Sequence, residues 1–342
     1  MMKLLLGGSP CTHWSIAQTK NRETEASGIG WELFLNYRIA RDKYQPDFFL
    51  YENNKSMSPA IREQITEELG VEPVLINSAL VSAQNRQRLY WVGRRNPDGT
   101  YSQVAVEQPV DRGILLRDIL ESGVCWKEKG YALLSTTGGT TADDMVARHQ
   151  RNGAAEPVAI KPLTEKEMDY MVRETKDGKG QFVIKAAGGK EIPVYEVRGG
   201  RITIKGKTYP IKLADGFYII RKLTVTECKR LQTVPDTYAF PVSDTQAYKM
   251  LGNGWTVDVI AHIMSHFTGL TEEPVEVLSM YDGMSCGHIA LDKLGAEIPA
   301  YYATEIDKYA VQTTQHNYPD TMQLGDAFQV RDDNWRIPNE TI

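Results

Sequence analysis

The sequence predicts an α/β fold built on a sheet of parallel strands. Short apolar runs of strand length alternate with helical segments, polar residues follow the strands at their C-terminal ends, and a strand, a glycine-containing turn and a helix succeed one another near the C-terminus. Ligands of such sheets gather beyond the C-terminal ends of the strands, so we expect the functional residues there.

The first strand carries a cysteine on the loop that follows it. An apolar run at residues 4–6 leads into a Gly-Gly-Ser-Pro turn and then Cys11. The glycines let the backbone approach a ligand closely and Pro10 restricts the loop, which favours a thiol held ready for nucleophilic attack. Taken alone, a single cysteine is more often a small buried apolar side chain.

The segments after this loop continue the alternation. Trp31, Leu35 and Ile39 share one helical face, and the buried strand that follows ends in polar residues. We predict a helix over 30–44, a strand over 47–51 that ends at 52–54, a helix over 58–69 with Pro59 in its first turn, a strand over 73–77, and a strand over 89–93 after the polar segment 84–88.

The middle of the chain is predicted to form a smaller, β-rich domain. Between residues 97 and 216 short alternating runs are separated by Gly-Gly, Gly-Lys and Asp-Gly turns. The 342-residue chain has a net charge of -5, yet residues 148–230 contain 18 Lys and Arg against 10 Asp and Glu. A basic segment on an acidic body fits a contact with nucleic-acid phosphates, although a solvated charged face explains the count equally well.

The C-terminal part has the layout of a nucleoside-binding unit. Helices over 224–231 and 256–268 and a linker ending at 274 precede a strand over 275–280, a turn and a helix, a layout in which backbone amides approach a nucleoside cofactor. Glu305 ends the next strand, where it could accept hydrogen bonds from ribose hydroxyls, and Asp326 ends the third, where it could bind an adenine amino group. Taken singly, either acid is as well explained as a helix N-cap or a turn residue.

Composition and the N-terminus indicate a cytoplasmic protein. The four cysteines are widely separated and form no CxxC pair, so neither a disulfide framework nor a zinc site is indicated. The initial apolar run is too short for a signal peptide, and no segment reaches membrane-spanning length. We expect no metal and no membrane partner.

Together these motifs resemble the cytosine-C5 DNA methyltransferase family. The resemblance covers the chain outside roughly residues 97–212. It rests on Gly8-Ser9-Pro10-Cys11, Glu52-Asn53, Gln84-x-Arg86-x-Arg88, Arg221–Thr224 through Arg230–Gln232, Leu251–Gly254, and Tyr281-x-Gly283 with Glu305 and Asp326.

The order of the motifs departs from that of most members, in which the cofactor strand, turn and helix precede the Pro-Cys loop. The chain therefore looks circularly permuted, with an artificial rearrangement as the alternative. The resemblance implies a Rossmann-like S-adenosylmethionine-dependent methyltransferase sheet with a β-rich target-recognition domain. The expected parts are the catalytic half at 1–96, the target-recognition domain at 97–216, a return to the catalytic domain at 217–270, a linker at 271–274 and the S-adenosylmethionine-binding half at 275–342.

The resemblance also implies roles for individual residues. Cys11 would attack C6 of cytosine and Glu52 would face N3 of the base. Arg88 would contact O2 and Arg86 would support the loop or the base. Because the two stand two residues apart on an extended segment, we also expect them to point to opposite faces. The other expected contacts are Ser9, Pro10, Asn53 and Gln84 with the substrate, and Tyr281, Asp282, Gly283, Met284, Ser285, Gly287, Glu305, Ile306, Asp326 and Asn253 with S-adenosylmethionine.

Three positions depart from the usual pattern of the family. Tyr281 stands where members usually carry Phe, Ser285 or Cys286 stands where they carry a second glycine, and Asn54 replaces the commoner Val. We expect Tyr281 still to stack on adenine. Asn253 is expected at a helix start on the cofactor side, or as a loop asparagine that satisfies backbone groups.

The implied activity is sequence-specific DNA (cytosine-5-)-methylation, with S-adenosylhomocysteine as the second product. The target cytosine would be flipped out of double-stranded DNA. We expect a monomer in a bacterial or phage-infected cell, associated with the nucleoid; a cognate restriction endonuclease could accompany it.

Three alternatives remain open at this point. A tRNA cytosine methyltransferase shares the fold, although a basic insert of this length favours DNA and the Cys-Phe-Thr signature of that branch is absent. A catalytically inactive DNA-binding relative would keep the fold without the reaction. A cysteine hydrolase would need a base, and His13 lies too near Cys11 in sequence to be an obvious one.

Overall fold

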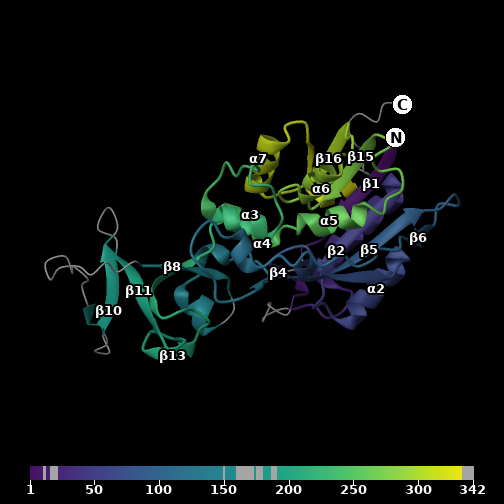
Figure 1. Cartoon of the computed structure of the whole chain (residues 1–342). Coiled ribbons are helices and arrows are strands. Elements are labelled where there is room, and N and C mark those ends of the chain that lie inside the picture. The colour runs from purple at the N-terminus through teal and green to yellow at the C-terminus, as the bar shows by residue number, and fades with distance from the viewer. Residues whose placement is uncertain are drawn as a thin grey trace.

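The computed structural model describes residues 1–10, 13–15, 22–148, 151–158, 173–174, 180–185 and 191–332. Its centre is a sheet with the strand order β17-β16-β15-β1-β2-β5-β3, to which β6 adds beside β5 (Figure 1). The strands are β1 (Met2–Gly7), β2 (Phe48–Asn54), β3 (Pro73–Asn77), β5 (Gln87–Arg95), β6 (Tyr101–Gln103), β15 (Val275–Met280), β16 (Ala300–Thr304) and β17 (Met322–Gly325).

The directions of the strands divide this sheet into two parts. β1 runs parallel to β2 and β15, and β15, β16 and β17 are parallel to one another. β5 runs antiparallel to β2, β3 and β6. The α/β fold is confirmed, but the expected parallel sheet is in fact mixed, because the connection from β3 to β5 is short and contains no crossover α-helix.

Helices cover both faces of the sheet. Leu4 and Leu6 of β1 face one hydrophobic core and Leu5 faces the other, because successive side chains of a strand alternate between faces. The core around Leu5 takes α1 (Gly28–Tyr44), α2 (Pro59–Leu69) and α8 (Ala327–Asp332), and the other takes α3 (Val225–Leu231), α4 (Asp244–Asn253), α5 (Val257–Met264), α6 (Cys286–Leu294) and α7 (Lys308–Asn317).

The cofactor-type strands lie beside the first strand of the chain. β15 pairs in parallel with β1 from Met2 opposite Val275 to Gly7 opposite Met280. The two strands therefore end together, and the turn at 281–285 leaves the sheet next to the loop that starts at Gly8. This register brings together two segments that are far apart in sequence.

A smaller sheet forms a separate lobe, on the left of Figure 1. Its order is β13-β12-β11-β10-β9, and β14 pairs with β11 and β8. β14 runs beyond the predicted boundary at 216, whereas β6, inside the predicted 97–216 segment, belongs to the central sheet. The strands are β8 (Gly153–Pro157), β9 (Arg173–Glu174), β10 (Gly180–Lys185), β11 (Glu191–Arg198), β12 (Arg201–Ile204), β13 (Lys207–Pro210) and β14 (Gly216–Lys222).

An ion-pair cluster joins this lobe to the helices over the central sheet. Arg221 of β14 donates two hydrogen bonds to the Glu227 carboxylate of α3, at 2.7 and 2.8 Å, and one to Glu156 of β8 at 2.7 Å. The Glu227 side chain is fully buried. The cluster fixes the exit of β14 relative to α3.

Two helices differ from the sequence prediction. The predicted helix over 256–268 ends at Met264, and α4 was not predicted at all. Among the described residues, no helix is both long and apolar enough to cross a membrane.

Candidate active site

The loop after β1 passes close to Glu52. β1 and β2 are parallel neighbours, with Gly7 opposite Tyr51, so the residues that follow them lie at one edge of the sheet. A side-chain carbon at Gly8 would lie 3.0 Å from the carbonyl oxygen and from Oε2 of Glu52. A larger residue would push against the Glu52 carboxylate, which gives a steric reason for glycine at position 8.

Asn53 ties the same loop to β2. Its side-chain amide donates to the carbonyl oxygen and to Oγ of Ser9, at 3.2 and 3.3 Å. The Tyr51 hydroxyl lies 2.6 Å from Ser9 Oγ. Asn53 and Ser9 are both buried, whereas Pro10 is exposed. Asn53 therefore orients the backbone that leads to Cys11, which itself lies outside the described residues.

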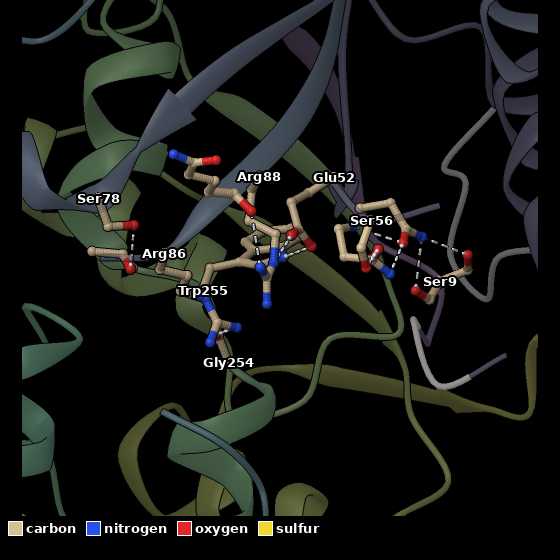
Figure 2. Close-up of polar contacts among 12 residues, drawn as sticks. Ser9, Glu52, Ser56, Ser78, Arg86, Arg88, Gly254 and Trp255 are labelled. Atoms are coloured by element: carbon tan, nitrogen blue, oxygen red, sulfur yellow. Dashed lines mark hydrogen bonds and ion pairs between the residues drawn. The ribbon is translucent and has the colours of Figure 1, made fainter. Parts of the chain in front are cut away.

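The Glu52 carboxylate is held by two donors. Arg88 Nε lies 3.0 Å from Oε1, and the indole Nε1 of Trp255 donates to Oε2 at 3.0 Å. Figure 2 shows Glu52 and Arg88 from the sheet meeting Trp255 from the segment between α4 and α5. Glu52 is 9% exposed to solvent, so a small part of the residue is still accessible.

Arg86 has a different environment from Arg88. Its guanidinium group donates to three backbone carbonyls, those of Leu133 at 3.1 Å, Gly252 at 3.3 Å and Gly254 at 3.0 Å. The two arginines do diverge (Figure 2), but their two-residue spacing does not cause it, since residues two apart on one strand share a face. They diverge because Arg86 lies in the break between β4 (Gln84–Asn85) and β5.

Gln84 lies in the interior of the protein. Its amide nitrogen donates to the Leu231 carbonyl at 2.8 Å and to Gln232 Oε1 at 2.7 Å, and its oxygen accepts from the Leu133 amide at 3.1 Å. The side chain is fully buried. Gln84 therefore joins three segments of the chain, and its hydrogen bonds go to protein groups rather than towards the expected substrate.

The turn at 281–285 contains two non-glycine residues with left-handed backbone. Tyr281 has φ 59° and Ser285 has φ 57°. The second value explains why a glycine is the usual residue of the family near this position. Tyr281 donates its hydroxyl to the Leu33 carbonyl of α1 at 2.7 Å, which fixes the ring between the turn and α1.

Asp282 organises the turn from within. Oδ1 accepts from Ser279 at 2.6 Å and from Tyr301 at 2.8 Å, and Oδ2 accepts from Ser285. Burial raises the pKa of Asp282 to about 6, although these hydrogen bonds act in the opposite direction. Both oxygens of the Asp282 carboxyl group thus accept hydrogen bonds from residues in or beside the turn.

Glu305 connects the turn to the end of β16. Its Oε2 accepts from the Gly283 amide at 2.8 Å, and Oε1 accepts from the amides of Ile306 at 2.8 Å and Asp307 at 2.7 Å. Ile306 is 76% exposed beside it. A side-chain carbon at Gly283 would meet nothing within 4 Å, so space lies open over the turn.

The remaining expected cofactor residues have mixed surroundings. Asp326 Oδ1 accepts from the Phe328 amide at 2.9 Å and so caps α8, as its alternative interpretation predicts. Gly287 packs against β1, where a side-chain carbon would lie 2.8 Å from Leu6. Met284 is buried, and its carbonyl oxygen accepts from Tyr238 at 2.7 Å. Asn253 is exposed at the C-terminal end of α4, so its expected place at a helix start was wrong.

Sequence reasoning missed Trp255 and Gln232. Gln232 donates to the carbonyls of Leu251 at 2.6 Å and Gly254 at 3.1 Å, and so holds the segment that carries Trp255. Both residues stand in or beside motifs quoted above, at 230–232 and 251–254. Their position in or next to these motifs was the one feature of the sequence that could have indicated them.

The three described cysteines are poor candidates for a nucleophile. Burial raises the pKa of Cys125 and Cys228 above the usual range and that of Cys286 to about 12. A thiol reacts as its thiolate, so such surroundings make these side chains inert. His13, the base considered for a hydrolase, has Nδ1 3.5 Å from a Glu23 carboxylate oxygen.

Comparison with known proteins decides the family. The family model described as C-5 cytosine-specific DNA methylase matches residues 1–268. The chain belongs to that family. It is therefore a DNA cytosine-5 methyltransferase, and the resemblance inferred from the motifs is confirmed. The matched range stops before β15.

Curated relatives agree with this assignment. The chain is 30% identical over 269 residues to the Type II methyltransferase M.HpaII of Haemophilus parainfluenzae, covering 75% of this chain and 69% of the relative. It is 28% identical over 276 residues to M.FnuDI of Fusobacterium nucleatum, covering 76% and 74%. A solved methyltransferase structure from Entamoeba histolytica overlaps with a TM-score of 0.44 at 11% identity, covering 77% of this chain and 76% of that one.

Proposed function

We propose that this methyltransferase transfers the methyl group of S-adenosylmethionine to C5 of a cytosine flipped out of double-stranded DNA. One observation carries the proposal: Glu52, the loop leading to Cys11 and the turn at 281–285 meet at one edge of the sheet. The meeting of an acid, a predicted thiol nucleophile and a nucleoside-type turn is what this chemistry requires.

The roles of the residues follow from the weak nucleophilicity of cytosine C5. The Cys11 thiolate forms a bond to C6, and the ring electrons move towards C5. Glu52 holds a proton at N3, and Arg88, 3.0 Å from Glu52, contacts O2. S-adenosylmethionine supplies an electrophilic methyl group when it is bound. Methyl transfer leaves S-adenosylhomocysteine. Water then takes the C5 proton, the electrons of that C–H bond re-form the C5–C6 double bond, and the thiolate leaves C6.

The ends of β15, β16 and β17 fit S-adenosylmethionine. Open space lies over Gly283, and the exposed Ile306 offers an apolar surface beside it. Glu305 and Asp326 keep further acceptor capacity on their carboxylates for ribose hydroxyls and an adenine amino group. We assign Asp282, Ser285 and Gly287 to the support of this turn rather than to direct contact.

The smaller lobe would recognise the DNA target. Its strands fall within the basic segment, which would contact phosphates and read base edges in the major groove. Asn53 and Ser9 would hold the loop, with Pro10, against the flipped base.

Three broader features belong to the same proposal. The chain would be a circularly permuted family member, because β15 and the turn after it follow residue 268 but lie beside β1. It would act as a monomer, since one flipped base needs one active site. It would serve DNA modification, with a restriction endonuclease of matching specificity as its partner.

The experiment is a comparison of methyl acceptors. The purified chain is incubated with tritiated S-adenosylmethionine and either genomic duplex DNA or total tRNA. Label in 5-methylcytosine of the duplex supports the proposal. Label in tRNA alone would overturn the DNA substrate, and cofactor binding without transfer to either would favour an inactive relative.

A further inference from the structure

The two donors on the Glu52 carboxylate come from different parts of the fold. Arg88 lies on β5, which pairs with the strand of Glu52. Trp255 comes from the segment between α4 and α5, and its Nε1 reaches Oε2 at 3.0 Å. Each oxygen of Glu52 thus has its own donor, and two donors fix the rotation of a carboxylate that one alone leaves free.

Hydrogen bonds to the two residues that flank Trp255 hold it in place. The carbonyl oxygen of Gly254 accepts from Arg86 at 3.0 Å and from Gln232 at 3.1 Å. On the other side, the buried Thr256 hydroxyl accepts from Ser78 at 2.9 Å. Trp255 is therefore carried by a rigid segment. A side chain that orients another one has to be held in this way.

The indole ring also faces the cofactor side of the site. Its Cζ3 lies 3.8 Å from where a side-chain carbon would stand at Gly287, in the first turn of α6. Its Nε1 lies 3.3 Å from the corresponding point at Gly8. One side chain thus adjoins Glu52, the loop leading to Cys11 and the helix that follows the turn.

We propose that Trp255 is a positioning residue that orients Glu52 towards the target cytosine through its indole N–H and supports α6 through its ring. The inference rests on the proposed role of Glu52. It separates two effects: loss of the N–H should impair the reaction at the base, and loss of the ring should also weaken cofactor binding.

The test uses Trp255→Phe, which keeps a ring and removes the donor. Loss of a hydrogen bond to a charged group should lower kcat for duplex DNA about 10- to 100-fold and leave KM for S-adenosylmethionine within about twofold. Trp255→Ala should in addition raise that KM. In a Glu52→Gln background, measured in single turnovers, Trp255→Phe should have almost no further effect, because the two residues act through one another.

Trp91→Phe is the matched control. Trp91 is fully buried on β5, and its Nε1 donates to Thr66 at 2.9 Å, so this variant also loses one indole hydrogen bond. It should keep wild-type kcat. The inference is overturned if Trp255→Phe keeps wild-type kcat, or if it lowers kcat as much in the Glu52→Gln background as in the wild type. The proposed function would stand in either case, as long as the wild-type chain transfers the methyl group. A wild-type chain that transfers no methyl group overturns both.

Discussion

Arg86 and Arg88 stand two residues apart and have different neighbours. Arg86 is buried and satisfies carbonyls of two loops, whereas Arg88 contacts the Glu52 carboxylate. The contacts of Arg86 join backbone segments, and the contact of Arg88 lies in the candidate site.

Replacement of each arginine by Met should separate these tasks. Arg86→Met leaves buried carbonyls without donors, so we expect a loss of about 3 kcal/mol of unfolding free energy together with lower activity. Arg88→Met should cost less stability than Arg86→Met, because Trp255 still donates to the Glu52 carboxylate, but it should remove most of kcat. Urea unfolding and methyl-transfer kinetics measure both. Equal stability losses for the two variants would contradict the division.

Residue types near the site were predictable, and their neighbours were not. Glu52 and Asn53 at the end of β2, and residues 8–10 after β1, could be placed because the end of a strand is a local feature of the sequence. The interior position of Gln84 and the contact of Trp255 with Glu52 depend on segments more than a hundred residues away in sequence. No local pattern carries such information.

At the scale of the element, the turn at 281–285 depends on its buried acid. Asp282 accepts hydrogen bonds from three hydroxyls, and Ser285, the N-cap of α6, has a left-handed backbone. Here hydrogen bonds compensate for a conformation that glycine would adopt more easily. The sequence predicted the strand, turn and helix, but not which residues would take positive φ.

Asp282 should make stability depend on pH. Its pKa in the folded protein is about 6 against an ordinary 3.8, so the folded state holds the proton more tightly. The stabilisation is complete below the ordinary value and is lost as pH rises through about 6. Relative to Asp282→Asn, the wild type should therefore lose about 2 kcal/mol between pH 4 and pH 7.

Urea unfolding of both proteins across that pH range measures this difference. A constant offset between Asp282→Asn and the wild type would mean that the buried carboxyl does not titrate there.

Element types were easier to predict than their directions. Apolar periodicity found β1, α1, β2, α2 and β15 within a few residues. The antiparallel direction of β5 was missed, because a strand of either direction has the same alternation. α4 was missed although its buried residues Ala247, Tyr248 and Leu251 recur at helical spacing.

At the scale of the whole molecule, Arg221 and Glu227 link the smaller lobe to the central domain. Burial alone raises the pKa of Glu227, but hydrogen bonds from Arg221 and from the amides of Thr224 and Glu121 outweigh it, and the pKa lies below its usual range. The pair therefore contributes stability near neutral pH that is lost on acidification.

Arg221→Met should destabilise the protein by about 3 kcal/mol, because it leaves a buried carboxylate short of a partner. Glu227→Gln added to it should recover part of the loss. Thermal and urea unfolding at neutral pH and at pH 4 test both statements. If the single variant is as stable as the wild type, the cluster does not join the two parts.

The motifs, rather than the apolar periodicity, indicated that the first and last parts of the chain form one domain. The pairing of β15 with β1 brings the last motifs beside the first. The alternating run that begins at Gly216 indicated the strand β14, but the boundary at 216 does not follow the smaller sheet, to which all of β14 belongs. A boundary within a continuous strand leaves no signal in composition.

The most direct test of the central claim is covalent trapping. The chain is incubated with S-adenosylmethionine and duplex DNA that contains 5-fluorocytosine, and the products are separated under denaturing conditions and mapped by peptide. Fluorine cannot leave C5 as a proton does, so a methylated adduct should remain bound to the enzyme. We predict attachment through Cys11 and none in Cys11→Ala. Methylated DNA without an adduct, or an adduct at another residue, would contradict the account.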